Sequence, residues 1–276
     1  MTAPPVWING ELVAAADASV PALDHGITVG DGVFETLRVY RGVPFALSRH
    51  LVRLGRSCDG LGLPCPQEDV LRGAVSDVVA ASDMPEARLR ITVTGGRAPL
   101  GSGRGTSPPT VIVALAPFEE WPASVHVATV PWPRNGHSAV AGLKTTSYAE
   151  NVIALAAAHA QGASEAIFGN TAGNLCEGTG SNVFLVIDDR IVTPPLDSGC
   201  LAGVTRELLL EQVDIEERDV PLWAITEAEE VFITSSTREV QPVSAVDGMT
   251  LSACPGPRTR EAAAALTALI ARDQDP

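Results

Sequence analysis

Hydrophobic residues recur along the chain at two spacings, and these spacings predict where strands and helices form. Apolar and polar residues alternate around an Asn-Gly turn at 6–12 and an Arg-Gly turn at 33–47, which predicts two β-hairpins. Apolar residues three and four positions apart predict helices at 49–63 and 68–81. Two further strands are expected, in ARLRITVTGG and SPPTVIVALAP. The first part of the chain is therefore expected to form an α+β domain.

The second part of the chain mixes the same two spacings over a longer run. Helices are predicted at 151–162, 204–213 and 257–274. The predicted strands are SVHVATVPW, SEAIFGN, SNVFLVID, RIVTP and EEVFITSS. PFEEWP, between the two parts, is the expected linker. The prediction is thus an α/β chain (α+β, two domains), with a small domain at 1–117, a linker at 118–122 and a larger domain at 123–276.

Composition and charge narrow the range of partners. The chain of 276 residues has 45% hydrophobic residues, which is typical of a globular protein. A net charge of −14 with no basic stripe argues against nucleic acid and against an anionic membrane surface. The N-terminus does not resemble a signal peptide, and no segment has the ~18 apolar residues of a membrane helix. Five scattered cysteines without a CxxC pair favour reduced thiols in the cytoplasm and no metal site.

Lys144 is the one lysine among 19 basic residues. A chain that uses arginine almost everywhere could retain a single lysine by chance. Alternatively, the position requires an amine, because a guanidinium cannot form an imine with a carbonyl group. Lys144 precedes a predicted helix in GLKTTSYAENVIA, with Tyr148 four residues further on. Tyr148 is equally compatible with a place in the core and with a ligand contact.

Glu177 is the second residue with candidate chemistry. It stands in LCEGTGSNVF, before a segment with almost no polar bulk, where a carboxylate needs a partner or becomes protonated. A protonated pyridine nitrogen would be such a partner, because the carboxylate would keep the ring protonated and electron-withdrawing.

Two further segments suit a phosphate group. In GCLAGVTREL a Gly-rich turn enters a helix, so Gly203, Val204 and Thr205 could offer backbone N–H groups and a hydroxyl, although the same arrangement also occurs as an ordinary cap. In ITSSTREVQPV three hydroxyl residues end a strand and form either a phosphate contact or a polar turn; they are Ser235, Ser236 and Thr237. Arg49 and Arg53 share a helix face, and turned inward one of them could supply positive charge.

These motifs together resemble the class IV (fold type IV) enzymes that depend on pyridoxal 5′-phosphate (PLP). This family includes branched-chain and D-amino-acid aminotransferases, (R)-amine transaminases and 4-amino-4-deoxychorismate lyases. The resemblance extends from about residue 6 to residue 248. The motifs that carry it, in chain order, are DHGITVGDGVFETLRVYRG, RHLVRL, LKTTSYAEN, LCEGTGSNVF, GCLAGVTRE and VFITSSTREVQPV.

The resemblance implies a fold, a cofactor and roles for individual residues. It implies a small α/β domain, a larger domain with a β-barrel-like core, a homodimer and bound PLP. Lys144 would form the Schiff base and move the proton between the substrate Cα and the cofactor C4′. Glu177 would pair with the pyridine nitrogen, and Tyr148 would reach O3′. The phosphate would be bound by Arg53, Val204, Thr205 and Ser236, with Thr237 beside them. In the branched-chain enzymes the comparable tyrosine lies one residue further from the lysine.

The reaction is expected to be transamination, in which an amino acid, with a D-amino acid as one option, donates its amino group to a 2-oxo acid through a pyridoxamine phosphate intermediate. The Arg-Asn-His element of D-amino-acid aminotransferases is missing from the loop at 95–109, so Arg90, Arg97 and Arg104 are the candidates for the substrate carboxylate. Phe34 is counted with them as a substrate-binding residue. Two alternatives stay open: a lyase that releases pyruvate and forms 4-aminobenzoate, and a non-catalytic PLP-binding protein.

Overall fold

The computed structural model describes residues 4–276, which divide by their contacts into two units. The first unit runs to Glu119 and also contains Leu143–Tyr148 and Asp273–Pro276. The second unit comprises Glu120–Gly142 and Ala149–Arg272. The sequence analysis assigned residues 143–148 to the second domain. They belong to the first unit instead, because their backbone is hydrogen-bonded to a strand of that unit.

The first unit contains a six-stranded antiparallel sheet, whose strand order is β2-β1-β6-β5-β3-β4. Its strands are β1 (Val6–Ile8), β2 (Glu11–Val13), β3 (Gly32–Tyr40), β4 (Val43–Pro44), β5 (Glu86–Thr94) and β6 (Thr110–Pro117). The two predicted hairpins, β1–β2 and β3–β4, are confirmed. Both residues of each turn, Asn9-Gly10 and Arg41-Gly42, have positive φ, which matches the twist of the adjoining strands.

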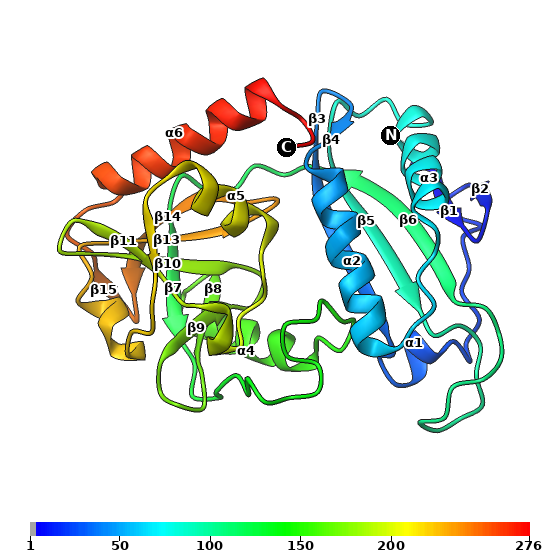
Figure 1. Cartoon of the computed structure of the whole chain (residues 1–276), viewed down its shortest axis with the longest axis horizontal. Helices are drawn as coiled ribbons and strands as arrows, with labels where there is room; N and C mark the ends of the chain where they lie inside the picture. The colour runs from blue at the N-terminus through cyan, green and yellow to red at the C-terminus, as the bar shows by residue number, and fades with distance from the viewer. Residues whose placement is uncertain (1–3) are drawn as a thin grey trace. The chain divides into compact units, whose positions relative to one another are not determined.

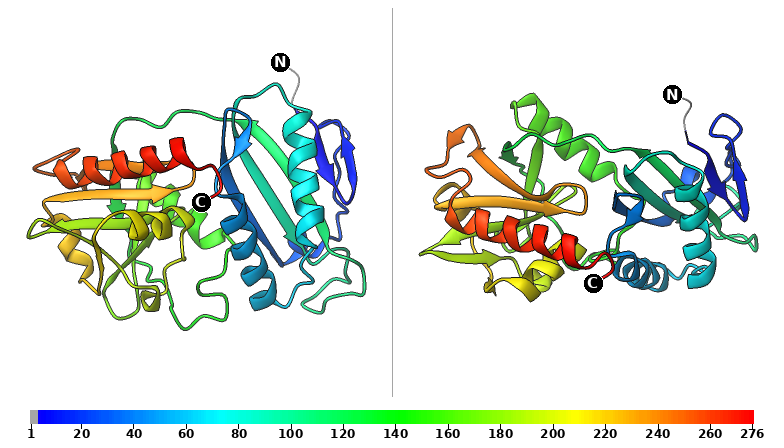
Figure 2. Two further views of the ribbon diagram at one scale, coloured as in Figure 1. Left: turned by 45° about the horizontal axis from the view of Figure 1, so that its top comes forward. Right: turned by 90° about the horizontal axis from the view of Figure 1, so that it is seen from above.

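Two helices, α2 (Leu47–Leu61) and α3 (Glu68–Ala80), cover one face of this sheet (Figures 1 and 2). A short helix, α1 (His25–Thr28), precedes β3. Alternate residues of β3 and β5 point toward the helices and form the core with them, including Leu37 and Ile91. The residues between these core positions, including Phe34 and Arg90, therefore lie on the opposite face of the sheet.

The second unit contains a nine-stranded mixed sheet with the strand order β12-β11-β10-β13-β14-β7-β8-β9 and β15 paired to β14. Its strands are β7 (Val125–Thr129), β8 (Glu165–Gly169), β9 (Leu175–Gly178), β10 (Asn182–Ile187), β11 (Arg190–Thr193), β12 (Ile215–Glu217), β13 (Glu230–Ser235), β14 (Glu239–Val246) and β15 (Met249–Thr250). Its α-helices are α4 (Ala149–Ala160), α5 (Val204–Gln212) and α6 (Pro257–Arg272), and its 3-10 helices are η1 (Leu196–Ser198) and η2 (Leu222–Thr226). Stacked Phe184 and Phe232 rings lie in the core under α5 and α6, with centroids 4.7 Å apart.

The predicted fold class is confirmed as a mixed α/β structure with two sheets. The five longer predicted helices are present as α2 to α6. The sequence analysis missed β14, because Pro242 lies inside it and the preceding residues were assigned to a polar turn. Among residues 4–276, no helix is long and apolar enough to cross a membrane.

Candidate active site

The segment that carries Lys144 is fixed to two elements of the first unit. Its carbonyl oxygen accepts a hydrogen bond from the Phe34 N–H at 3.0 Å. Its own N–H donates to the buried Ser57 hydroxyl of α2 at 3.1 Å. Two residues later, the Thr146 N–H donates to the Gly32 carbonyl at 2.8 Å. The backbone of Lys144 is therefore held between β3 and α2, which limits where its amine can reach.

The aromatic ring of Phe34 gathers three of the predicted site residues. The Lys144 amine lies 4.4 Å from the ring centroid, and the guanidinium carbon of Arg90 lies 3.8 Å from it. Tyr148 meets the same ring edge-on, with centroids 5.2 Å apart. Partial desolvation lowers the pKa of Arg90, which nevertheless remains a cation at neutral pH. This face of the first unit thus combines an amine, a fixed positive charge and a phenol.

Arg53 lies on the other side of β3, in a buried charged cluster. Its Nε and Nη2 atoms donate to the two oxygens of Glu35 at 2.8 and 2.7 Å, and His50 Nδ1 lies 2.6 Å from the same carboxylate. Burial raises the pKa of Glu35, but the charges of Arg53 and His50 outweigh it and hold this pKa well below its ordinary value. Burial lowers the pKa of His50, and this effect outweighs the Glu35 carboxylate, which raises it by charge and by hydrogen bonding. Arg53 is therefore the buried counter-ion of Glu35 within the first unit.

The two loop arginines predicted for substrate binding occupy different environments. Arg97 is exposed, and its backbone pairs with Asp24. Arg104 donates from Nε to Asp31 at 2.7 Å, and from Nη1 and Nη2 to the last carbonyls of α2, at Gly62 and Leu61, both at 2.7 Å. The guanidinium of Arg104 therefore ties the loop at 95–109 to α2 and to the residue before β3.

His25 takes part in the same loop contact. Its Nδ1 lies 2.7 Å from Asp31 Oδ2, and its Nε2 lies 3.0 Å from the Gly101 carbonyl oxygen. The hydrogen bond to Asp31 raises the pKa of His25, and the bond to Gly101 adds to the effect. Only the imidazolium can donate from both ring nitrogens at once, so the doubly bonded state is the protonated one.

Glu177 lies in β9 of the second unit and is mostly buried. Its Oε1 accepts from Arg134 Nε at 3.1 Å, and its Oε2 accepts from the Leu201 N–H at 2.9 Å. The carboxylate therefore has a cationic partner within the unit, as its burial requires. The bond to Leu201 also brings Glu177 next to the turn that leads into α5.

That turn presents the start of α5 without a side-chain cap. Gly203 is the N-cap residue, and a Cβ added there would overlap the amide of Asn182 unless that side chain moved. Val204 and Thr205, the first two residues of α5, are buried. The unsatisfied N–H groups of a first helical turn attract anions, and the Thr205 hydroxyl adds a donor. The donor set fits a phosphate group.

The predicted hydroxyl residues lie beside this helix start. Asn182 Nδ2 donates to the Leu201 carbonyl at 2.8 Å, and Asn182 is the register partner of Thr234 on β13. Ser235 ends β13, and its hydroxyl accepts from the Arg238 N–H at 3.1 Å across the turn that contains Ser236 and Thr237. The second unit thus brings Glu177, the N-terminus of α5 and the end of β13 together around Asn182.

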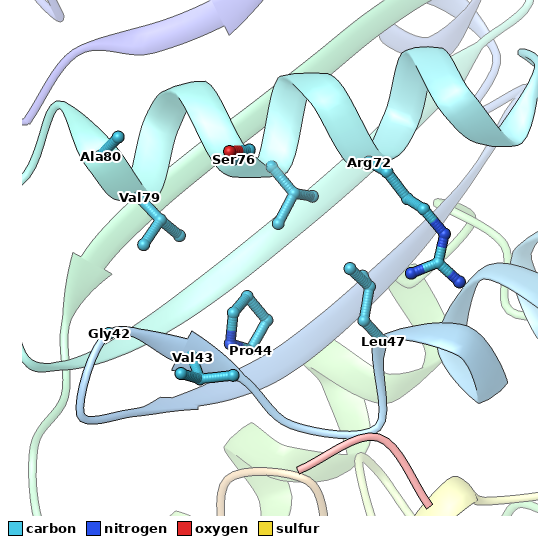
Figure 3. Close-up of a pocket in the computed structure, with 9 residues that line it drawn as sticks. Gly42, Val43, Pro44, Leu47, Arg72, Ser76, Val79 and Ala80 are labelled. Atoms are coloured by element: carbon cyan, nitrogen blue, oxygen red, sulfur yellow. The ribbon is translucent and has the colours of Figure 1, made fainter.

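A cavity of about 280 Å³ lies elsewhere in the first unit, between the β3–β4 hairpin and α3 (Figure 3). Apolar side chains such as Val43 and Val79 line most of it, and Arg72 lies at the end next to Leu47. None of the predicted site residues lines this cavity.

Comparisons with known proteins agree with these features. The family model of amino-transferase class IV matches residues 32–246. The D-alanine aminotransferase of Bacillus licheniformis is 32% identical over 276 aligned residues, covering 95% of each chain. The branched-chain-amino-acid aminotransferase of Escherichia coli strain K12 is 28% identical over 267 residues, covering 88% of this chain and 85% of the relative. The chain belongs to the class IV aminotransferase family and is a PLP-dependent transaminase.

A solved relative supports the fold and the cofactor. The branched-chain amino acid aminotransferase from T.th., in a complex with N-(5′-phosphopyridoxyl)-L-glutamate, superposes with a TM-score of 0.91 at 26% identity. The match covers 98% of this chain and 95% of the relative. Fold type IV and the cofactor PLP, both expected from the sequence motifs, are confirmed.

Three residues of these clusters were missed by the sequence analysis. Glu35 had a visible signal in the sequence. It lies two positions from Val33 and from Leu37, so it shares their strand face and is a carboxylate on an apolar face. Arg134 had none, because its partners are distant in sequence and it stands outside the quoted motifs. Asn182 lies within the motif LCEGTGSNVF, but its partner Leu201 is 19 positions further on.

Proposed function

We propose that this transaminase moves an amino group from an amino acid to a 2-oxo acid, with Lys144 as the residue that bonds to the cofactor and carries the proton. The observation that carries the proposal is the grouping of the Lys144 amine and the Arg90 guanidinium around one aromatic ring, that of Phe34. An amino acid presents an amine and a carboxylate on adjacent atoms. A cation close to the reactive amine suits that pair of groups.

The residues proposed to hold PLP are those that the sequence motifs indicate. Glu177 would pair with the ring nitrogen, and Tyr148 would contact O3′. The phosphate would be bound by Arg53 from α2 and by residues of the α5 start and the β13 end: Gly203, Val204, Thr205, Ser235, Ser236 and Thr237. The bound cofactor supplies an aldehyde carbon and an electron-withdrawing ring that stabilises negative charge at the substrate Cα.

Lys144 is proposed to act twice. Its amine would hold the cofactor covalently when no substrate is present, and the freed amine would carry the proton that leaves the substrate Cα. A neutral amine is required for both tasks. The anchored backbone of Lys144 limits the range of the amine in both tasks.

Arg90 is the arginine that we propose for the substrate carboxylate. Arg104 serves the loop contact with Asp31, and Arg97 lies exposed in that loop. Arg90 stands on a strand, where its position is more closely defined than on a loop, and Phe34 supports its guanidinium. Phe34 would form the wall beneath the substrate.

A single-turnover assay tests the proposed function. Purified protein with PLP is mixed with D-alanine or L-leucine, the cofactor absorbance is followed, and 2-oxoglutarate is then added to restore the first spectrum. We expect at least one amino acid to drive the full cycle. Lys144→Ala should show neither the parent spectrum nor turnover. Failure of all amino acids, together with release of 4-aminobenzoate from aminodeoxychorismate, would replace transamination by the lyase reaction.

The same proposal includes a homodimer and a cytoplasmic location. Apolar side chains are exposed on and near α1, at Leu23, Ile27 and Val29, and such surfaces favour contact with a second copy. Light scattering of the purified protein and cell fractionation test these two points separately.

A further inference from the structure

All three guanidinium nitrogens of Arg134 donate hydrogen bonds to residues of the second unit. Nε donates to Glu177 at 3.1 Å, Nη1 donates to Glu150 at 3.0 Å, and Nη2 donates to Asn151 at 2.7 Å. Its guanidinium carbon also lies 3.9 Å from the centroid of the Phe168 ring. The side chain of Glu150 is 64% exposed, whereas that of Glu177 is 14% exposed. The contact with Glu177 is therefore the shielded, stronger one.

The surroundings of Arg134 fix the direction of its side chain. Its N–H donates to the Gly169 carbonyl at 2.8 Å, at the end of β8. Asn151, which is buried on α4, donates from Nδ2 to the Thr179 carbonyl at 2.5 Å, so its amide oxygen must face Arg134. Three acceptors and one aromatic face thus define the plane of the guanidinium. A lysine ammonium could not satisfy these acceptors from one plane.

The consequence for Glu177 is a carboxylate held at both oxygens. Arg134 holds Oε1, and the Leu201 N–H, from the turn before α5, holds Oε2. The positive charge of Arg134 beside Oε1 also partly neutralises the negative charge of Glu177. A second cation on the same carboxylate, such as a protonated ring nitrogen, is therefore attracted less than it would be to a carboxylate without Arg134.

We propose that Arg134 is a positioning residue for the cofactor: it orients Glu177 toward the ring nitrogen and moderates the charge that Glu177 presents to it. This inference rests on the proposed role of Glu177. It predicts that Arg134 acts on PLP through Glu177 and that its exposed partner Glu150 does not contribute.

A double-mutant cycle tests the inference. Arg134→Met, Arg134→Lys, Glu177→Gln and the combination of Arg134→Met with Glu177→Gln are prepared, with Glu150→Gln as the matched control on the same guanidinium. PLP is titrated into each cofactor-free protein, and the dissociation constant and the absorbance maximum of the bound cofactor are recorded. The melting temperature of each cofactor-free protein is measured by circular dichroism.

We expect Arg134→Met to raise the dissociation constant about tenfold or more, in the range found for residues that orient a ligand-binding group, and to shift the absorbance maximum. The sign is set by orientation, because the loss of a fixed Glu177 carboxylate outweighs the stronger attraction of its uncompensated charge. In the Glu177→Gln background the same substitution should change the dissociation constant less than about twofold. If Arg134 acts only through the Glu177 carboxylate, its replacement has little effect once that carboxylate is gone. Arg134→Lys should be intermediate, and Glu150→Gln should match the parent. If Arg134→Met does not fold, Arg134→Lys takes its place in the cycle.

Three results would overturn the inference. Equal changes in both backgrounds would show that Arg134 supports the fold and does not act through Glu177. Unchanged binding and spectrum in both Arg134 variants would show no role at all. If Glu177→Gln itself left binding and spectrum unchanged, the role proposed for Glu177 would fail and this inference with it, whereas the first two results would leave that role standing.

Discussion

Glu35 is a fully buried carboxylate in the first unit, and its replacement by glutamine gives a sharp test of the cluster around it. Glutamine keeps the shape of the side chain but removes the charge that balances Arg53. His50 would also lose its anionic partner. The substitution therefore leaves a buried guanidinium beside α2 without the counter-charge of Glu35.

The expected loss of stability follows from this burial. Removing one partner of a buried ion pair costs about 3–5 kcal/mol, because the remaining charge stays desolvated. Glu86 offers a matched control on the neighbouring strand β5, where it pairs with Arg38 at 2.8 Å but is 42% exposed. Exposed pairs contribute only about 0–1 kcal/mol. Glu35→Gln should therefore destabilise the protein several times more than Glu86→Gln.

The assay is urea unfolding of the cofactor-free protein at neutral pH, followed by tryptophan fluorescence and circular dichroism. Trp7 is buried in the core of the first unit and reports on it. The pKa of Glu35 is held below its ordinary value of 4.5, so its contribution is fully present above that pH and is lost as the pH falls further. The difference in the free energy of unfolding between the parent and Glu35→Gln should be constant at neutral pH and become smaller in acid. An equal loss in Glu35→Gln and Glu86→Gln would refute the reasoning.

Three further substitutions have specific expected outcomes. Arg90→Gln should raise the KM for the amino acid about tenfold or more with a smaller change in kcat, because one charge-assisted bond to the carboxylate is worth about 1.5–3 kcal/mol; steady-state kinetics measures both. Because the pKa of His25 is raised, its stabilisation of the loop at 95–109 is full below pH 6.5 and is lost as the pH rises through the raised pKa. The amide exchange rate of this loop, corrected for the intrinsic effect of pH, should therefore increase over that pH range in the parent. It should not increase in this way in His25→Gln. Gly203→Ala should weaken PLP binding by forcing the α5 start to shift, whereas Gly180→Ala, where a Cβ meets open space, should bind PLP like the parent.

The sequence was sufficient for most of the elements and for the place of the candidate residues within them, because both depend on short-range patterns. The helix α5 begins at the Gly-Val-Thr that the motif indicates, and β13 ends in the predicted hydroxyl run. The hairpin turns β1–β2 and β3–β4 follow from single Asn-Gly and Arg-Gly pairs, each with positive φ at both residues. These features need no knowledge of distant parts of the chain.

The partners of the charged residues could not be predicted in the same way. Arg134 and Glu177 are 43 positions apart, and Arg104 and Asp31 are 73 positions apart. Each pair depends on how separate elements pack against one another. The spacing of hydrophobic residues predicts the elements but not the contacts between them. The assignment of residues 143–148 to the second domain was wrong for the same reason, since hydrogen bonds to β3, and not their place in the sequence, decide where they pack.

Glu35 shows that such a partner can sometimes be inferred. Strand alternation puts residues 33, 35, 37 and 39 of VFETLRVY on one face, and three of them are apolar. A carboxylate in that row must be buried, and a buried carboxylate requires a cation. The next predicted helix carries arginines and a histidine, of which His50 and Arg53 turn inward. The alternation of one strand and the spacing of one helix therefore indicate a basic residue of this helix as the partner of Glu35, and the structure identifies it as Arg53.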